Sequence, residues 1–205
     1  MKYIILLFWV LLLPVQAAAA TDIPVLIPHS QNLAALAYFG KTSPTGCGVR
    51  ITGEADGGLW INVLLSVFVR EGKEPTAMFK VVVRKIVMQD GAPLQQDGRV
   101  VYADVGNIRK AWLINSAGVR LEPGRSGEAQ HGDGYMTSLD FGHAMNMLVS
   151  ISMADFRIGF SRGETDPDTI FEFNQRMTHA EAGRLTTCMK NLREAMEENH
   201  NGESL

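Results

Sequence analysis

The chain has 205 residues, of which 46% are hydrophobic and 20% are charged, and its formal net charge is −3. This length and composition suit one globular domain with a real core, and the 20 glycines and 8 prolines exclude collagen-like and low-complexity classes. The slightly negative charge gives no electrostatic support to a role in nucleic-acid binding.

The first 20 residues have the pattern of a secretory signal peptide. Lys2 gives a positive start, Ile4–Leu13 is an unbroken apolar run, and Ala17–Ala20 offers small residues for cleavage. A spanning helix needs about 20 apolar residues, so we expect cleavage near Ala20 rather than an uncleaved membrane anchor. The expected location is therefore the periplasm or the secreted fraction.

After the signal, we predict one domain over residues 21–198 and a disordered polar tail over residues 199–205. Its first part is rich in β-branched and large apolar residues and predicts strands. The predicted strands are a short edge strand at Leu36–Phe39, then Gly46–Thr52, Leu59–Arg70, Met78–Met88, Arg99–Val105 and Lys110–Asn115, with Val119–Leu121 as a continuation. Asp-Gly pairs at 90–91 and 97–98 predict turns, and the absence of a fixed-period repeat excludes solenoids and propellers.

The last third of the chain predicts two helices with a hairpin between them. Residues 139–149 carry apolar side chains at helical spacing, with Thr137 or Ser138 as the N-cap. Asp155–Ser161 and Thr169–Gln175 alternate like strands. Thr178 and Glu181 have capping-box spacing at the start of a helix that runs to about residue 198. The inward stripe of this last helix is expected to be Leu185, Cys188, Met189, Leu192 and Met196.

Many closely spaced strands followed by two helices predict an α+β fold, an antiparallel β-sandwich with two C-terminal helices. Cys47 and Cys188 are the only cysteines, and an even number in an exported chain predicts a disulfide. Such a bridge contributes about 4–5 kcal/mol on a chain-entropy argument.

One motif suggests catalysis. Gly159–Gly163 matches G-x-S-x-G around Ser161, and Asp166, Asp168 and His179 follow in the order of a hydrolase triad. A nucleophile elbow requires a strand before the serine and a helix after it, whereas the residues after Ser161 predict a turn into another strand. Catalysis by Ser161 therefore stays an alternative, and the preferred expectation is a protein without catalytic residues.

A second cluster of polar residues could suggest a metal site. Asp140 and His143 are three residues apart on a predicted helix, and His131 and Asp133 precede them. A carboxylate in the first turn of a helix is explained by the helix dipole, and the two earlier residues suit an ordinary loop. We therefore expect neither a metal nor another cofactor.

The long polar segment Glu122–Gly134 is predicted to be a loop that is either disordered or functional. Its candidate partner-binding residues are Arg125, Glu128, His131 and Asp133.

The order of elements at the end of the chain is similar in outline to one known family. Asp155–Phe160, Thr169–Phe173 and the helix from His179 resemble the invasion-associated locus B family of periplasmic proteins. The resemblance implies a β-sandwich of the bacterial envelope, associated with virulence and without known catalysis. That family usually has two cysteine pairs and a cysteine close to an N-terminal tryptophan, whereas this chain has one pair and no such tryptophan.

We therefore expect an exported, non-enzymatic protein that binds a protein or an envelope component. One alternative is an inhibitor or immunity protein against a cell-wall or secreted enzyme, in which the loop over 122–134 enters the cleft of its partner. The other is a serine hydrolase that uses Ser161. The sequence leaves the oligomeric state open.

Overall fold

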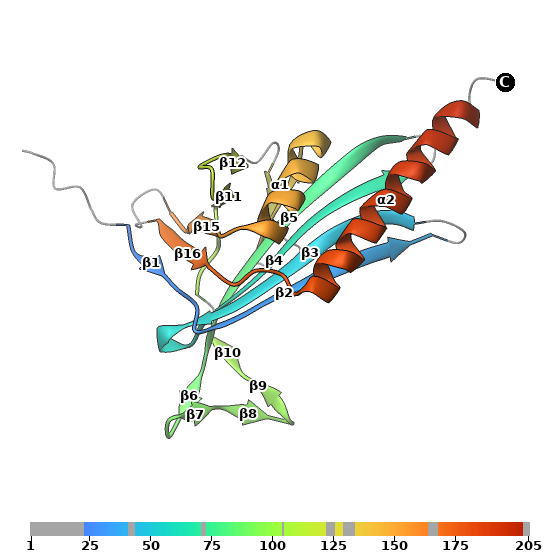
Figure 1. Ribbon diagram of the computed structural model, residues 1–205. Coiled ribbons are helices and arrows are strands. Elements are labelled where there is room, and N and C mark those ends of the chain that lie inside the picture. Colours follow the sequence, from blue (N-terminus) through green and yellow to red (C-terminus); the bar gives the residue numbers. More distant parts are fainter. Residues whose placement is uncertain are drawn as a thin grey trace, which may run out of the picture.

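The computed structural model describes residues 23–40, 44–70, 73–103, 105–121, 126–128, 134–163 and 168–202. The predicted signal peptide lies outside these residues. The described chain has the predicted α+β architecture, with mostly antiparallel sheets arranged as a sandwich, two helices in the last third, and a disulfide between Cys47 and Cys188 (Figure 1).

A long sheet forms one layer, with strand order β13-β14-β5-β4-β3-β2 and with β10 paired to β5. All of its neighbouring strands are antiparallel. The strands are Ser30–Phe39 (β2), Pro44–Ala55 (β3), Leu59–Arg70 (β4), Lys73–Ile86 (β5), Tyr102–Ala103 (β10), Ser126–Glu128 (β13) and Gly134–Leu139 (β14). A short 3-10 turn, Asp56–Gly58 (η1), joins β3 to β4.

Alternating side chains decide which face of the long sheet becomes core. In β4, Ile61, Val63 and Leu65 are fully buried, whereas Asn62 and Leu64 between them are half-buried. The same alternation continues along β5. Because successive side chains of a strand point to opposite faces, the sheet has one well-covered inner face.

A second, smaller sheet lies over one end of that inner face, with strand order β1-β16-β15-β11-β12. Its first pair, β1 with β16, is parallel, and the others are antiparallel. The strands are Val25–Leu26 (β1), Lys110–Asn115 (β11), Arg120–Leu121 (β12), Phe156–Ser161 (β15) and Thr169–Phe173 (β16).

Aromatic side chains join the two layers. Phe156, Phe160, Phe171 and Phe173 of the small sheet are at most 2% exposed. At Gly53 in β3, an added Cβ would lie 3.0 Å from the Phe173 ring. Glycine at this position therefore lets the two sheets approach closely.

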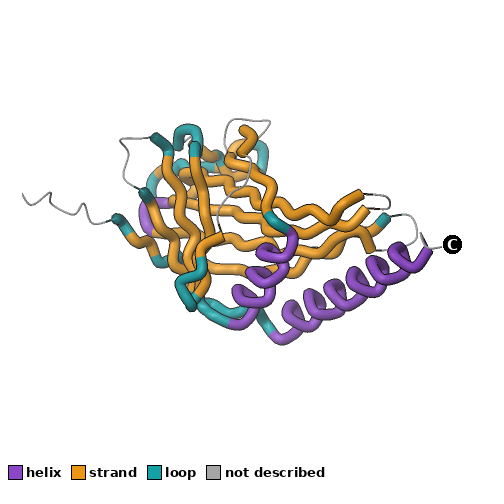
Figure 2. The backbone as a smooth tube through the Cα atoms, turned by 90° about the horizontal axis from the view of Figure 1, so that it is seen from above, coloured by secondary structure: helices purple, strands orange, loops and turns teal. Residues whose placement is uncertain are grey.

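Both helices cover the remaining inner face (Figures 1 and 2). Helix α1, Phe141–Met153, contacts β4 and β5, and helix α2, His179–Gly202, contacts β2 and β3. The predicted stripe of α2 is confirmed, because Leu185, Cys188 and Leu192 are buried while Met189 and Met196 pack against the core. The disulfide joins α2 to β3 with 5.9 Å between the Cα atoms.

Between β5 and β10 the chain forms a triangular arm that projects from the body (Figure 1). It contains two hairpins, made by Met88–Gln89 (β6) with Ala92–Pro93 (β7) and by Gln95–Gln96 (β8) with Arg99–Val100 (β9). The predicted Asp-Gly turns are present, and Asp90 and Asp97 both have positive φ angles.

Three backbone hydrogen bonds close the arm. The N–H of Val87 donates to the carbonyl of Val101, that of Leu94 to Val87, and that of Val101 to Leu94, at 2.7–3.0 Å. These residues are seven apart, and Gln-Asp-Gly recurs at 89–91 and 96–98. Two turns of one type thus produce two similar hairpins, and the strand order of the described sheets is that of neither a solenoid nor a propeller, as predicted.

Several predicted boundaries are corrected. Strand β2 begins at Ser30, six residues before the predicted start, because Leu33 is buried and Ala35 packs against the core, although alanine is a weak strand former. The predicted strand over 99–105 is divided between β9 and β10 at Val101. The N–H and the carbonyl of this residue make two of the hydrogen bonds that close the arm. Helix α2 runs to Gly202, four residues into the predicted disordered tail.

The start of α1 is also corrected. Gly134–Leu139 is a strand whose Thr137 side chain is 2% exposed and points into the core, so it is not the N-cap. Asp140 caps the helix instead, since its carboxylate accepts the N–H of His143 at 2.8 Å. The helix ends at Met153, four residues after the predicted end.

Candidate functional site

The outer edge of β2 is an open backbone edge beside a cavity. Strand β2 is the last strand of the long sheet. The N–H of Ala35 points away from β3, because it donates to the carboxylate of Glu181 in α2 at 2.8 Å. Backbone groups alternate along a strand, so those of Leu33 and Ala37 point outward as well.

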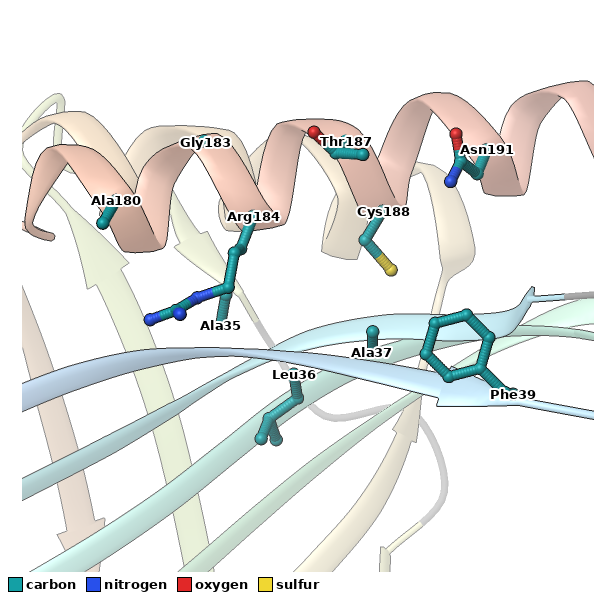
Figure 3. A pocket seen from close by; sticks show the side chains of 10 residues that line it. All are labelled: Ala35, Leu36, Ala37, Phe39, Ala180, Gly183, Arg184, Thr187, Cys188 and Asn191. Atoms are coloured by element: carbon teal, nitrogen blue, oxygen red, sulfur yellow. The ribbon is translucent and has the colours of Figure 1, made fainter.

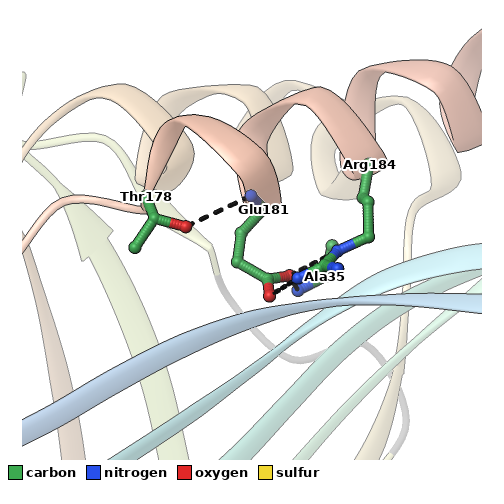
Figure 4. Close-up of polar contacts among 4 residues, drawn as sticks. All are labelled: Ala35, Thr178, Glu181 and Arg184. Carbon is green, nitrogen blue, oxygen red and sulfur yellow. Dashed lines mark hydrogen bonds and ion pairs between the residues drawn. The ribbon is translucent and has the colours of Figure 1, made fainter.

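Glu181 links the edge to α2 (Figure 4). Its own N–H donates to the Thr178 hydroxyl at 3.2 Å, which confirms Thr178 as the cap. Its carboxylate does not complete the predicted capping box but accepts from Ala35 and from the guanidinium of Arg184, whose Nε lies 3.2 Å away. The start of α2 is thereby fixed to the middle of β2.

Upstream of this point the edge is covered. The Gln31 amide donates to Pro28 O and Asn174 Oδ1, and its oxygen accepts from the N–H groups of Asn174 and Gln175. The segment between β16 and α2 is therefore held against the first residues of β2. The part of the edge beyond Ala35 has no such cover among the described residues.

A groove lies beside this uncovered part, between β2 and α2 (Figure 3). Its volume is about 450 Å³. Most of its lining side chains are small, and they are Ala35, Leu36, Ala37, Phe39, Ala180, Gly183, Arg184, Thr187, Cys188 and Asn191. Phe39 is 73% exposed at the end of β2. The groove offers apolar space next to outward-pointing main-chain groups.

The G-x-S-x-G segment has structural explanations. An added Cβ at Gly159 would lie 2.2 Å from the Trp112 ring, so glycine makes room for the tryptophan. The Ser161 hydroxyl donates to the carbonyl of Gly163 at 2.8 Å in a bend, and no helix follows directly. His179 is exposed at the first position of α2, Asp168 is half-buried before β16, and Asp166 lies outside the described residues.

Asp140 and His143 lie together at the start of α1. The Asp140 Oδ1 to His143 Nδ1 distance is 3.4 Å, and both side chains are exposed. Within the described part of the chain, no three His, Cys, Asp or Glu side chains gather in a way that would hold a metal ion. His131 and Asp133 lie outside that part.

The candidate loop over 122–134 is partly a strand. Ser126–Glu128 pairs with β14, with Gly127 opposite Met136 and Glu128 opposite Tyr135. The prediction of one continuous loop was therefore wrong. Strand β14, in which Tyr135, Thr137 and Leu139 are buried, was missed as well, because Thr137 or Ser138 was interpreted as a helix cap. Arg125, His131 and Asp133 lie outside the described residues.

Comparisons with protein-family models, with curated proteins and with solved structures give no match for this chain. Neither helix of the described residues is both long and apolar enough to cross a membrane. The disulfide is compatible with an exported protein.

Sequence reasoning missed the groove. Its signal was present in two spacings: Leu33, Ala35 and Ala37 alternate with strand period, and Ala180, Gly183 and Thr187 follow helical spacing next to the buried stripe. Small residues on both elements leave space between them. Their juxtaposition depends on a pairing 146 residues apart in sequence, between Ala35 and Glu181.

Proposed function

We propose that this chain is an exported, non-enzymatic binding protein that holds an extended polypeptide along the free edge of β2. The observation that carries the proposal is the position of that edge beside the groove under α2. An exposed strand edge is a template for one more strand, in which main-chain hydrogen bonds give affinity and side-chain pockets give specificity.

The geometry favours a polypeptide as the partner. The outward N–H and C=O groups near Ala37 are complemented by the backbone of another strand. The small apolar lining of the groove suits apolar side chains of modest size. Glu181 already accepts the N–H of Ala35, so the added strand would pair from Ala37 toward Phe39.

Export and envelope association are part of the same proposal. They are supported by the signal-like pattern of residues 1–20 and by a disulfide, which persists in oxidising compartments. The outline similarity to the invasion-associated locus B family points the same way. We place the protein in the periplasm or the secreted fraction, with a protein or an envelope component as its partner.

Site-specific photo-crosslinking tests the proposal. Phe39 is replaced by p-benzoylphenylalanine, which keeps an aromatic ring at an exposed position, and the cells that make the protein are irradiated. The matched control is the same replacement at Tyr102, an exposed aromatic residue at the base of the arm. We expect one polypeptide adduct from position 39 and none from position 102.

The adduct also separates the alternatives. An adduct from position 39 that contains only a second copy of this chain, or no adduct at all, would contradict the proposal. An inhibitor acting through residues 122–134 would instead crosslink to an enzyme from that segment and not from position 39. The serine hydrolase alternative is tested separately, by substitution of Ser161.

A further inference from the structure

A second cavity, of about 380 Å³, lies where the small sheet meets the end of the long sheet. Its lining includes Leu26 of β1, Asp56 of η1, Leu59 of β4, Lys85 of β5, Arg162 after β15 and Thr169 of β16. The parallel pair β1–β16 and a hydrogen bond from Ile170 N–H to Pro24 O, at 3.1 Å, fix its walls. It is separate from the groove at β2 and shares no lining residue with it.

Arg162 is the unusual residue of this cavity. Its Nε is shielded from solvent and has no hydrogen-bond acceptor among the described residues. The guanidinium carbon lies 5.3 Å from the centroid of the Phe160 ring, which orients the group. Shielded donors in folded proteins are nearly always paired, so an acceptor from outside the described chain would complete this one.

The other lining residues define the acceptor. Lys85 brings a second positive charge, and Thr169 brings a hydroxyl that donates or accepts. The carboxylate of Asp56 disfavours ligands with more than one negative charge, such as phosphate esters. Leu26 and Leu59 supply apolar walls.

We propose that this cavity binds a single carboxylate carried by a short apolar body, with Arg162 as the principal ligand-binding residue. The planar guanidinium fork suits a carboxylate in a bidentate pair. Two sources share this chemistry, a medium-chain fatty acid and the C-terminus of an apolar peptide.

The test is a titration of the full chain, followed through the ¹⁵Nε–H resonances of its arginines. The probes are octanoate and acetyl-Leu-Leu with a free C-terminus, and the matched neutral probes are octanol and acetyl-Leu-Leu-amide. We expect one of the carboxylates to shift the Arg162 resonance saturably and its neutral analogue not to do so. The carboxylate that binds more tightly identifies the source.

Variants complete the test. Arg162→Gln should weaken binding of that carboxylate by roughly tenfold or more, because a hydrogen bond to a charged group is lost. Arg109→Gln removes an exposed arginine that is not part of the lining and should leave binding unchanged. The proposal is overturned if neither carboxylate shifts the wild-type resonance, if the neutral analogues bind equally well, or if Arg162→Gln binds like the wild type. The wild-type titration decides the matter even where the variant folds poorly.

Discussion

The small sheet and helix α2 cover different parts of the inner face of the long sheet, and different forces hold them there. The small sheet is held by a block of phenylalanines, in which Phe156 and Phe173 stack with centroids 5.0 Å apart. Helix α2 contributes a narrower stripe that includes Leu185 and Leu192, and it is joined to β3 by the disulfide.

The difference explains why a groove remains beside α2. Stacked aromatic rings leave little room between the layers where they pack, because packing requires close contact on all sides, and the lining of the cavity at Arg162 includes none of these phenylalanines. A covalently attached helix can keep its position with only one flank buried. The other flank of α2, with Ala180, Gly183 and Thr187, can therefore border a groove without loss of the helix.

The largest effect is expected from removal of the covalent link. The double variant Cys47→Ala/Cys188→Ala opens a loop of 141 residues and should lower the free energy of unfolding by about 5 kcal/mol on the chain-entropy argument. Chemical denaturation measures this loss, and hydrogen exchange locates it. We expect the amides of α2 to lose protection before those of β15 and β16. Equal loss of protection in both regions would show that the disulfide does not hold α2 selectively.

Truncation in the aromatic block should have the next largest effect. Phe173→Ala removes a fully buried ring that packs between the layers, and such changes cost about 3–5 kcal/mol. Phe173→Leu keeps much of the volume and should cost less. Denaturant titrations of both variants measure the two losses. If Phe173→Ala cost under about 1 kcal/mol, the small sheet would not depend on its aromatic contacts.

Replacing one glycine by alanine in each region is expected to change the free energy of unfolding in opposite directions. Gly159→Ala places a Cβ 2.2 Å from the Trp112 ring and should cost about 1–3 kcal/mol through overpacking. Gly183→Ala, in α2, meets nothing within 4 Å and should stabilise the helix by up to about 1 kcal/mol. Thermal unfolding of the two variants gives both signs, and near-ultraviolet circular dichroism reports Trp112. A stabilising Gly159→Ala variant would contradict the close packing described for the small sheet.

The fold could be predicted from the sequence where a single physical signal dominates. The runs of β4 and β5, the stripe of α2 and the disulfide were all predicted, because long apolar periodicity and an even cysteine count are strong signals. The strand predicted at the position of β2 was too short, because the alanines of β2 favour helix over strand. Its place at the sheet edge was nevertheless predicted correctly.

The candidate sites were harder to predict for a different reason. The groove and the cavity at Arg162 join residues far apart in the chain, and only the pairing of sheets brings them together. The local motif at Ser161 was visible in the sequence, but its first glycine, Gly159, makes room for the Trp112 ring of the neighbouring strand. Short motifs therefore did not identify the cavities.

The link between α2 and the edge of β2 should give a smaller effect. Glu181→Ala removes the acceptor of the Ala35 N–H and a favourable charge in the first turn of the helix, for a loss of about 1–2 kcal/mol. Glu181→Gln keeps an acceptor oxygen and should lose less. Hydrogen exchange at the Ala35 amide measures the local change. Equal exchange rates in the wild type and in Glu181→Ala would show that this hydrogen bond does not protect the edge.

The smallest effect is expected at Ser161. Its hydroxyl donates one hydrogen bond to Gly163, and both residues are half-buried, so water can take over the carbonyl in Ser161→Ala. The free energy of unfolding should therefore fall by at most about 1 kcal/mol. Crosslinking from position 39 should be unchanged, and so should octanoate and acetyl-Leu-Leu binding. His179→Ala, at the exposed start of α2, is the matched variant and should behave in the same way.

A purified protein that hydrolyses p-nitrophenyl esters, and loses that turnover in both variants, would instead establish Ser161 as a nucleophile. A helix directly after the serine would normally help to stabilise the oxyanion, and here Ser161 is followed by a bend. We therefore expect no such turnover. The two proposed activities of the molecule are then both binding activities, one at the groove beside β2 and one at the Arg162 cavity.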